Sequence, residues 1–392
     1  MNQKERVLAA LNHEEPDRVP THAILIDANN VDKILGKPEI NDFQTMEQVK
    51  QQSEGNWIDE FNNLVESVQT SIFSRCVEAS VKIGLDCMQI GLVPLKFIDE
   101  QDANGIPVMQ DIFGRIWRAL NNEGNFNPYY IRGTTNTVAK WNDTKERLLG
   151  PYTEKYSKFA KRFFKSINGK HKDDIFVIAT NDLAGVFEST WQGMGIEFFT
   201  RQLHKDKEFI KKAFDVIADF TIAINKAYID AGCEVFIESG DLAYKNRPMM
   251  SPRDFHDLLL PAYQKITTAV HERGKKIVLH SDGYITPLLD FIMESGFDGL
   301  HSLEPTAGVN LSEVKTKVDN KLCLMGGIDV AHVLVDGTKQ EVEDAVKNAI
   351  KIAGRGGGYI ISPANMHPGI SVENLKWMVD ATRKFGNYPI PD

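Results

Sequence analysis

Short apolar and β-branched runs alternate with amphipathic helical patterns along most of the chain. Two runs near the start and six in the second half predict eight strands: Thr21–Ile26, Asp86–Ile90, Ile175–Thr180, Cys233–Glu238, Lys276–His280, Gly299–Leu303, Leu322–Gly326 and Gly358–Ser362. Helical spacing of apolar residues follows in Pro252–Arg273, Ile285–Ser295, Leu311–Lys317, Gln340–Ala353 and Val372–Phe385. Strands that alternate with helices in this way pair in parallel through right-handed crossovers.

Eight β/α units are the number that a closed (β/α)8 (TIM) barrel requires. An open, doubly wound sheet is the alternative, but no Gly-rich dinucleotide-binding turn follows the first strand. We therefore predict a protein of the α/β class, with one barrel domain spanning residues 1–392. Asn2–His13 predicts an N-terminal helical extension. In Pro94–Arg118, short apolar runs broken by turn residues predict a small antiparallel β insertion beside one mouth of the barrel.

The composition indicates which partners and which cellular compartment to expect. Apolar residues make up 42% of the chain and charged residues 25%, and the net charge of −9 comes without a dense Lys/Arg block, so neither a nucleic acid nor an anionic membrane is expected as a partner. No signal-peptide pattern and no apolar stretch of about 18 residues is present. The four cysteines are widely spaced, which argues against a disulfide framework and indicates a reducing compartment. Cys233 and Cys323, which lie in predicted strands, are expected to be small buried thiols. The sequence therefore predicts a cytoplasmic protein and leaves its homo-oligomeric state open.

Polar residues cluster where the predicted strands end. In a barrel these ends meet at the C-terminal mouth, where active sites lie. The clusters comprise Glu238 and Asp241, His280 and Asp282, Glu304, and, after the last strand, Asn365 and His367.

The chemistry of these clusters is open to more than one interpretation. An imidazole with converging carboxylates, as His280 would have with Asp282 and Glu304, binds zinc or another divalent ion. The same groups also suit a general acid/base set, or a structural hydrogen-bond network. Glu238 and Asp241 can both point into the mouth as catalytic carboxylates, but Asp241 could instead cap the following segment.

Several motifs together resemble the uroporphyrinogen decarboxylase superfamily. They are Arg6–Asn12 followed by Pro16–Pro20, Met250–Pro252 leading into Phe255–Tyr263, the His280–Gly283 turn, and Gly326–Asp329. The resemblance runs from about Lys4 to Trp377. It implies a barrel and one of at least two chemistries, decarboxylation of a porphyrinogen or cobamide-dependent methyl transfer.

The resemblance favours the methyltransferase branch. True decarboxylases of the superfamily carry an Arg-rich segment just after the first strand, whereas His22–Ala28 contains no arginine to hold a substrate with many carboxylates. The cobamide-dependent methyltransferases hold zinc through a His-x-Cys pair and a distant Cys. His280 matches that histidine, but Asp282 stands in place of the paired cysteine, and the last strand ends without one. Any metal set must therefore use nitrogen and oxygen: His280, Glu304, Asp282 and His367.

Harder ligands suit activation of an ether oxygen rather than a thiol. The resemblance thus implies an O-demethylase methyltransferase that moves a methyl group from a small donor, such as a methoxylated aromatic compound, to the Co(I) corrinoid of a partner protein. The only D-x-H sequence, Asp254–His256, lacks the glycine of corrinoid carriers, so the corrinoid is expected on a separate protein.

Apart from the metal ligands, the expected site residues have two roles: His280, Asp241 and Glu238 in catalysis, and Asn365, Tyr244 and Asn181 in substrate binding. A metal-independent decarboxylase of a carboxylate substrate and a non-catalytic, ligand-binding barrel are the alternatives.

Overall fold

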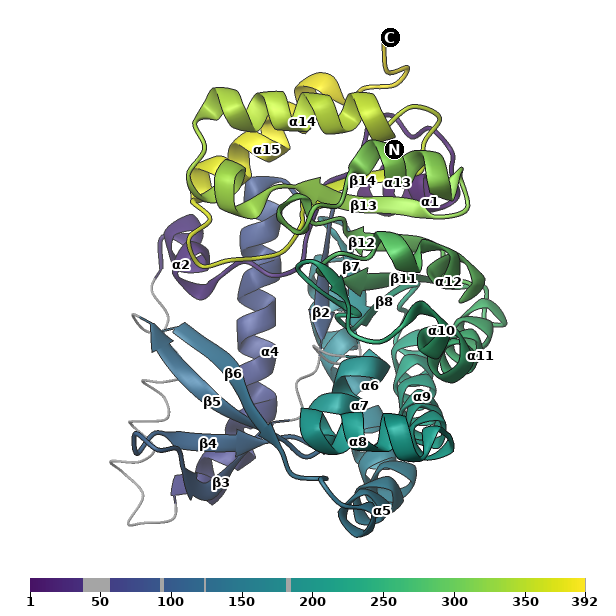
Figure 1. The fold of residues 1–392 in the computed structure, drawn as a ribbon. Coiled ribbons are helices and arrows are strands. Elements are labelled where there is room, and N and C mark those ends of the chain that lie inside the picture. Colours follow the sequence, from purple (N-terminus) through teal and green to yellow (C-terminus); the bar gives the residue numbers. More distant parts are fainter. Residues whose placement is uncertain (38–56, 92–94, 123–124, 181–184, 392) are drawn as a thin grey trace.

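A computed structural model describes residues 1–37, 57–91, 95–122, 125–180 and 185–391. Its centre is a sheet of eight parallel strands surrounded by helices (Figure 1). In spatial order the strands are β1 (His22–Ala23), β2 (Cys87–Gly91), β7 (Phe176–Thr180), β8 (Val235–Ser239), β11 (Lys276–Ser281), β12 (Gly299–Ser302), β13 (Cys323–Ile328) and β14 (Tyr359–Pro363).

The sheet closes on itself between its first and last strands. Thr21 forms a parallel bridge with Ile361, and the N–H of Ile361 donates to the carbonyl of Pro20 at 2.9 Å. The fold is therefore the predicted (β/α)8 barrel, and each of the eight predicted strands overlaps a strand of this sheet.

Helices connect the strands and cover the outside of the barrel. They are α2 (Ala28–Leu35), α4 (Trp57–Ile83), α5 (Val138–Arg147), α6 (Thr153–His171), α7 (Gly185–Met194), α8 (Ile196–Lys205), α9 (Lys207–Asp230), α11 (Leu260–His271), α12 (Leu289–Glu294), α13 (Leu311–Val318), α14 (Lys339–Ala353) and α15 (Val372–Phe385). The segment predicted as one helix from Pro252 to Arg273 is divided: α10 (Pro252–Asp254) and a wide π-helical turn precede α11, because Pro261 lies in the first turn of α11 and has no N–H to donate to the preceding turn. Each helix among the described residues is too short or too polar to span a lipid bilayer.

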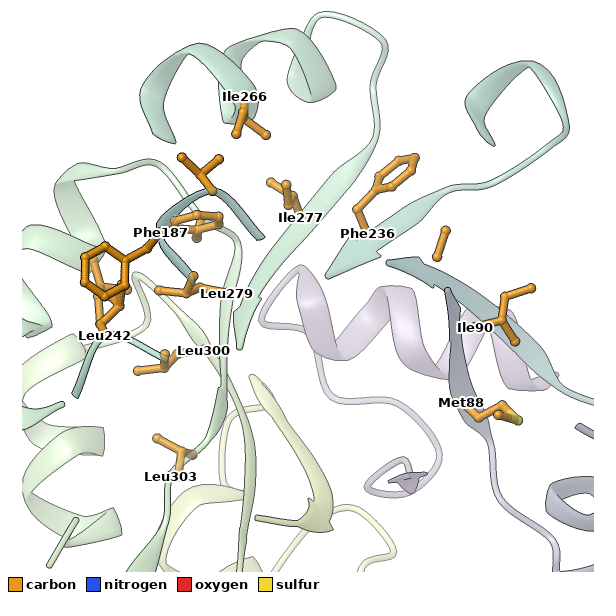
Figure 2. Packing of buried hydrophobic residues seen from close by; sticks show 14 of the residues in the cluster. Met88, Ile90, Phe187, Phe236, Leu242, Ile266, Ile277, Leu279, Leu300 and Leu303 are labelled. Carbon is orange, nitrogen blue, oxygen red and sulfur yellow. The ribbon is translucent and has the colours of Figure 1, made fainter. Parts of the chain in front are cut away.

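The alternation of side chains along each strand separates two apolar layers. Phe236, Ile277, Leu279 and Leu300 point outward and pack beneath the helices (Figure 2). The neighbours of these residues in sequence point inward, and the inner cluster includes Ile178, Ile237, Val278, Cys323 and Met325. All four cysteines are buried free thiols, as predicted for Cys233 and Cys323.

Helix α1 (Gln3–Leu11) closes the N-terminal end of the barrel. Val7, Ala10 and Leu11 of this helix belong to the inner apolar cluster. The side-chain amide of Gln3 donates to the carbonyl of Asp174, just before β7, at 2.9 Å. The predicted N-terminal extension is thus a plug at the end of the barrel opposite the predicted site.

The predicted β insertion is a four-stranded antiparallel sheet of β3 (Lys96–Gln101), β4 (Pro107–Gln110), β5 (Arg115–Asn122) and β6 (Asn125–Gly133). It is longer than the predicted segment, because β6 adds a further hairpin strand after Arg118. Pro94, the first residue of the predicted segment, lies outside the described residues. The sheet packs against α7 and α4.

Candidate active site

Two carboxylate side chains and one imidazole converge at the C-terminal mouth of the barrel. One ligand atom each from Asp241, His280 and Asp282 lie within 4.8 Å of one another. Nε2 of His280 is 3.9 Å from Oδ1 of Asp241. We refer to these three residues as the mouth group.

The strand alternation places His280 in the mouth group. Val278 points inward on β11, so His280, two residues later, also points inward near the end of the strand. Asp282 follows in the turn, where its N–H donates to Oδ1 of Asp241 at 2.8 Å. The loops after β8 and β11 therefore hold each other together through the mouth group itself.

Two further loops hold the carboxylate of Asp282. The hydroxyl of Ser302, at the end of β12, donates to Oδ1 of Asp282 at 2.5 Å, and the side-chain amide of Asn365 donates to Oδ2. Ser302 has a φ of +98°, an unfavourable region for a residue with a Cβ. Gly326 of β13 lies so close that a Cβ there would be 2.2 Å from the Ser302 carbonyl. Backbone strain of this kind gathers where packing fixes a functional geometry.

The buried surroundings of Asp282 change its protonation. Burial is the largest of the causes that together raise the pKa of Asp282 to about 7. The carboxylates of Asp241 and Glu304 act in the same direction, and His280 and the Ser302 hydroxyl act in the opposite direction. A cation placed among these oxygens would offset the repulsion between the carboxylates.

A layer of polar side chains lies beneath the mouth group, inside the barrel. Nδ1 of His280 lies 2.7 Å from Nδ1 of His301, whose Nε2 lies 3.2 Å from the hydroxyl of Ser362. Nδ1 of His22 approaches the same hydroxyl at 3.0 Å. Burial holds the pKa of His301 well below its ordinary value and lowers that of His22 to about 3, and the charge of His280 acts in the same direction on both.

Sequence reasoning did not single out His22, His301 or Ser362. The alternation of side chains along β11 and β12 predicts that His280 and His301 both point inward, and the two residues lie opposite each other on these neighbouring parallel strands. The sequence pattern does not show which residues of the distant strands β1 and β14 they contact.

Helix α7 and the β insertion support Asp241 from the side. The N–H of Asp241 donates to Oε2 of Glu188 at 3.1 Å, and Oε1 of Glu188 accepts from the amide of Gln192 at 2.9 Å. Oε1 of Gln192 accepts in turn from Arg115 of β5 at 3.3 Å. Arg115 is buried in an ion pair with Asp111. A series of hydrogen bonds therefore connects the insertion to the mouth group.

Glu304 and His367, both expected as metal ligands, are not in the mouth group. Oε2 of Glu304 accepts the N–H of Gly283 at 2.9 Å and thereby fixes the turn that carries Asp282. The ring of His367 is exposed, and its Nδ1 accepts the N–H of Gly369 at 3.0 Å.

Glu238, expected as a catalytic carboxylate, lies on the outward side of β8. Its neighbours Ile237 and Ser239 take the inward positions, and Oε1 of Glu238 accepts the N–H of Val186 at 2.8 Å, in the first turn of α7. The expectation that Glu238 and Asp241 share the mouth therefore holds for Asp241 alone, because Asp241 is beyond the end of the strand and Glu238 is still subject to its alternation.

Of the residues expected to bind substrate, Asn365 contacts Asp282 and is exposed. Tyr244 is 48% exposed and lies beside the same turn, where its carbonyl accepts the N–H of Tyr284 at 2.9 Å. Asn181 lies outside the described residues.

The mouth group fits a divalent cation. It offers one imidazole nitrogen and two carboxylates, a donor set that suits zinc and other first-row divalent ions and is typical in number of a catalytic site with an open position. Asp241 and Asp282 also accept hydrogen bonds from their surroundings, as metal-bound carboxylates in proteins do.

Comparison with known proteins gives one family and a matching fold. The model of the uroporphyrinogen decarboxylase (URO-D) family matches residues 184–385, just over half of the chain. The uroporphyrinogen decarboxylase of Actinobacillus succinogenes is 24% identical over 196 residues, which cover 47% of this chain and 51% of that protein. The methylcobamide:CoM methyltransferase MtbA of Methanosarcina acetivorans is 25% identical over 190 residues, covering 47% and 51%. The chain thus spans about half the length of the curated relatives that it matches.

A solved structure extends the likeness in fold to the whole chain. A methyltransferase from Methanosarcina mazei superposes with a TM-score of 0.68, covering 98% of this chain and 99% of that one at 18% identity. At this identity the likeness shows the same barrel with its additions.

Proposed function

Because the chain belongs to the uroporphyrinogen decarboxylase (URO-D) family, we propose that it transfers a methyl group from a small methylated compound to the corrinoid of a partner protein. The observation that carries this proposal is the mouth group, in which an imidazole and two carboxylates converge at the barrel mouth. The presence of a methylcobamide:CoM methyltransferase among the relatives supports it.

The charge of the mouth argues against decarboxylation of a porphyrinogen. A substrate with many carboxylates needs bidentate cationic partners. The segment that follows β1, from Ile24 to Ala28, contains no arginine, and Asp27 in it caps α2. Asp241, Asp282 and Glu304 would instead repel such a substrate.

Asp241, His280 and Asp282 would hold the metal, with zinc the best fit to two oxygens and one nitrogen. When bound, a divalent ion supplies Lewis acidity to the oxygen from which the methyl group leaves. Removal of a methyl group from an ether leaves the electron pair of the C–O bond on oxygen, while the methyl carbon takes a pair from the reduced corrinoid. Stabilisation of the negative oxygen is therefore where the site contributes most.

The remaining residues position these groups and the substrate. Ser302 and Asn365 orient the carboxylate of Asp282 from two sides. Tyr244 offers an exposed ring beside the mouth, which suits a methoxylated aromatic donor, and the amide of Asn365 offers polar contact there.

The first test measures metal content in the full-length chain after dialysis, with His280→Ala and, as a control, the exposed His204→Ala. About one zinc per chain in the wild type and in His204→Ala, lost in His280→Ala, is expected for a site with three protein ligands. Methyl transfer from methoxybenzoates to free cob(I)alamin, followed by the change in cobalamin absorbance, tests the reaction directly.

Two outcomes would count against the proposal. Release of CO2 from a porphyrinogen without any need for a corrinoid would establish the decarboxylase alternative. Absence of metal from the wild type would remove the Lewis-acid role, and Asp282, with its raised pKa, would then be the group able to give a proton to the leaving oxygen.

A further inference from the structure

Four side chains from four strands form a continuous line inside the barrel. From the mouth inward they are His280 of β11, His301 of β12, Ser362 of β14 and His22 of β1, with successive separations of 2.7, 3.2 and 3.0 Å. His22, His301 and Ser362 have no exposed surface. We call this line the histidine chain.

The carbonyl of Pro363 sets the direction of the histidine chain. The hydroxyl of Ser362 donates its single proton to this carbonyl at 2.9 Å, and a carbonyl oxygen can only accept. The oxygen of Ser362 must then accept from both rings that approach it. Nε2 of His301 and Nδ1 of His22 therefore carry hydrogen.

This direction decides the tautomer of His280. His301 is fully buried, and its ring partners are the Ser362 hydroxyl, the Pro363 carbonyl and the imidazole of His280, none of which is an anion, so it is neutral and has one N–H. With that hydrogen on Nε2, Nδ1 of His301 is an acceptor. The short contact between the two Nδ1 atoms then requires the hydrogen to be on Nδ1 of His280. Nε2 of His280, the atom nearer Asp241, is left with its lone pair in the mouth group.

The inner end of the histidine chain shows that it does not carry protons to solvent. His22 has 0% exposed surface, and its Nε2 has no hydrogen-bond partner among the described residues. A proton relay needs a path to solvent. A series of hydrogen bonds that ends at a buried atom instead fixes which ring nitrogens carry hydrogen.

We propose that His301 is a positioning residue that holds His280 in the tautomer able to bind a metal through Nε2, a role that rests on the proposed metal-dependent function. Ser362 and the Pro363 carbonyl supply the direction, since they force the hydrogen of His301 onto Nε2. Hydrogen bonding of the second ring nitrogen is the usual means by which proteins orient a metal-binding imidazole.

The test compares zinc affinity, measured by competition with a chelator, among full-length variants. His301→Leu removes the acceptor and is expected to weaken zinc binding roughly 10- to 100-fold. His301→Asn places an amide oxygen where Nδ1 lay and is expected to restore most of the affinity. Ser239→Ala is the matched control, because Ser239 is the residue opposite His280 on β8 but bonds to Thr180. Zinc affinity of His301→Leu equal to that of Ser239→Ala would overturn the proposal.

Nitrogen-15 NMR of histidine-labelled protein without metal provides a second readout. The spectrum is expected to show His280 with hydrogen on Nδ1, assigned by its loss in His280→Ala, and a shift toward the other tautomer in His301→Leu. Hydrogen on Nε2 of His280 in the wild type would refute the positioning role. This result is independent of zinc binding, so it separates failure of the positioning role from failure of the proposed function.

Discussion

The carboxylate of Glu304 accepts the backbone N–H of Gly283 at 2.9 Å, which ties the end of β12 to the turn after β11. The other oxygen of Glu304 accepts from the hydroxyl of Thr306 at 2.6 Å, so the side chain is held in place from its own loop. Asp282 precedes Gly283 directly. The position of a candidate metal ligand therefore depends on a carboxylate that is not itself in the mouth group.

Two replacements of Glu304 distinguish the contribution of its hydrogen bond to stability from the contribution of its charge. Glu304→Ala leaves the buried N–H of Gly283 without an acceptor and is expected to lower the free energy of unfolding by about 1–3 kcal/mol. Glu304→Gln keeps an acceptor and is expected to lose less. Urea unfolding in the presence of a chelator measures both, with the exposed Glu272→Ala as the control. Equal stability of Glu304→Ala and the control would show that the turn does not need this hydrogen bond.

The stability of the protein is expected to fall as the pH drops below about 6.5, because of its buried neutral histidines. The pKa of His22 is lowered from 6.5 to about 3, so the unfolded chain takes up a proton that the folded chain refuses across this interval. The contribution of His22 is fully present above pH 6.5 and is lost at about 1.4 kcal/mol per pH unit on the way down.

The variant His22→Asn isolates this contribution, since an amide can still donate to Ser362. Urea unfolding between pH 6 and pH 4.5 should show a flatter dependence on pH in His22→Asn than in the wild type. The exposed His204→Asn is expected to leave the slope unchanged. Identical slopes in His22→Asn and the wild type would mean that His22 is protonated in the folded state.

The buried ion pair of the insertion is expected to be worth far more than a pair on its surface. The side chains of Arg115 and Asp111 are 1% and 0% exposed, so Arg115→Met leaves a buried carboxylate without its cation and is expected to cost about 3–5 kcal/mol. Arg132→Met breaks a pair with Glu100 in which both side chains are about half exposed, and about 1 kcal/mol or less is expected.

Hydrogen exchange locates the effect of Arg115→Met. Faster exchange is expected in β4, β5 and α7, because Gln192 of α7 loses its contact with Arg115. If exchange became faster in the hairpin of β4 and β5 but not in α7, the insertion would not be coupled to the barrel through Gln192.

The fold was predictable because its signal is local and repeated. Each predicted strand is a run of five or six residues bounded by turn residues, and an error at its ends leaves the unit recognisable, as for β8, predicted from Cys233 and observed from Val235. The predicted insertion ends at Arg118, short of the fourth strand, because the sequence of β6 (Asn125–Gly133) lacks the apolar alternation of a half-buried strand.

The site was predictable only where sequence position fixes direction. Asp241 and Asp282 follow strands and reach the mouth whatever the exact register. Glu238 lies one residue inside the last inward position of β8, and that single residue turns its side chain to the opposite face. The histidine chain joins residues up to 340 positions apart, from β1 to β14, and such a contact depends on the closure of the barrel rather than on any local pattern.

Helix α1 has a consequence for the mouth at the far end of the barrel. Val7, Ala10 and Leu11 fill the N-terminal opening with apolar side chains, and apolar surroundings lower the local dielectric constant around the polar groups inside the barrel. His22 and His301 stay uncharged in that medium, and only uncharged rings can hold hydrogens in one fixed order. Helix α1 at the N-terminal end of the barrel thus contributes to keeping the histidines beneath the mouth group uncharged, although it lies at the opposite end from the mouth group.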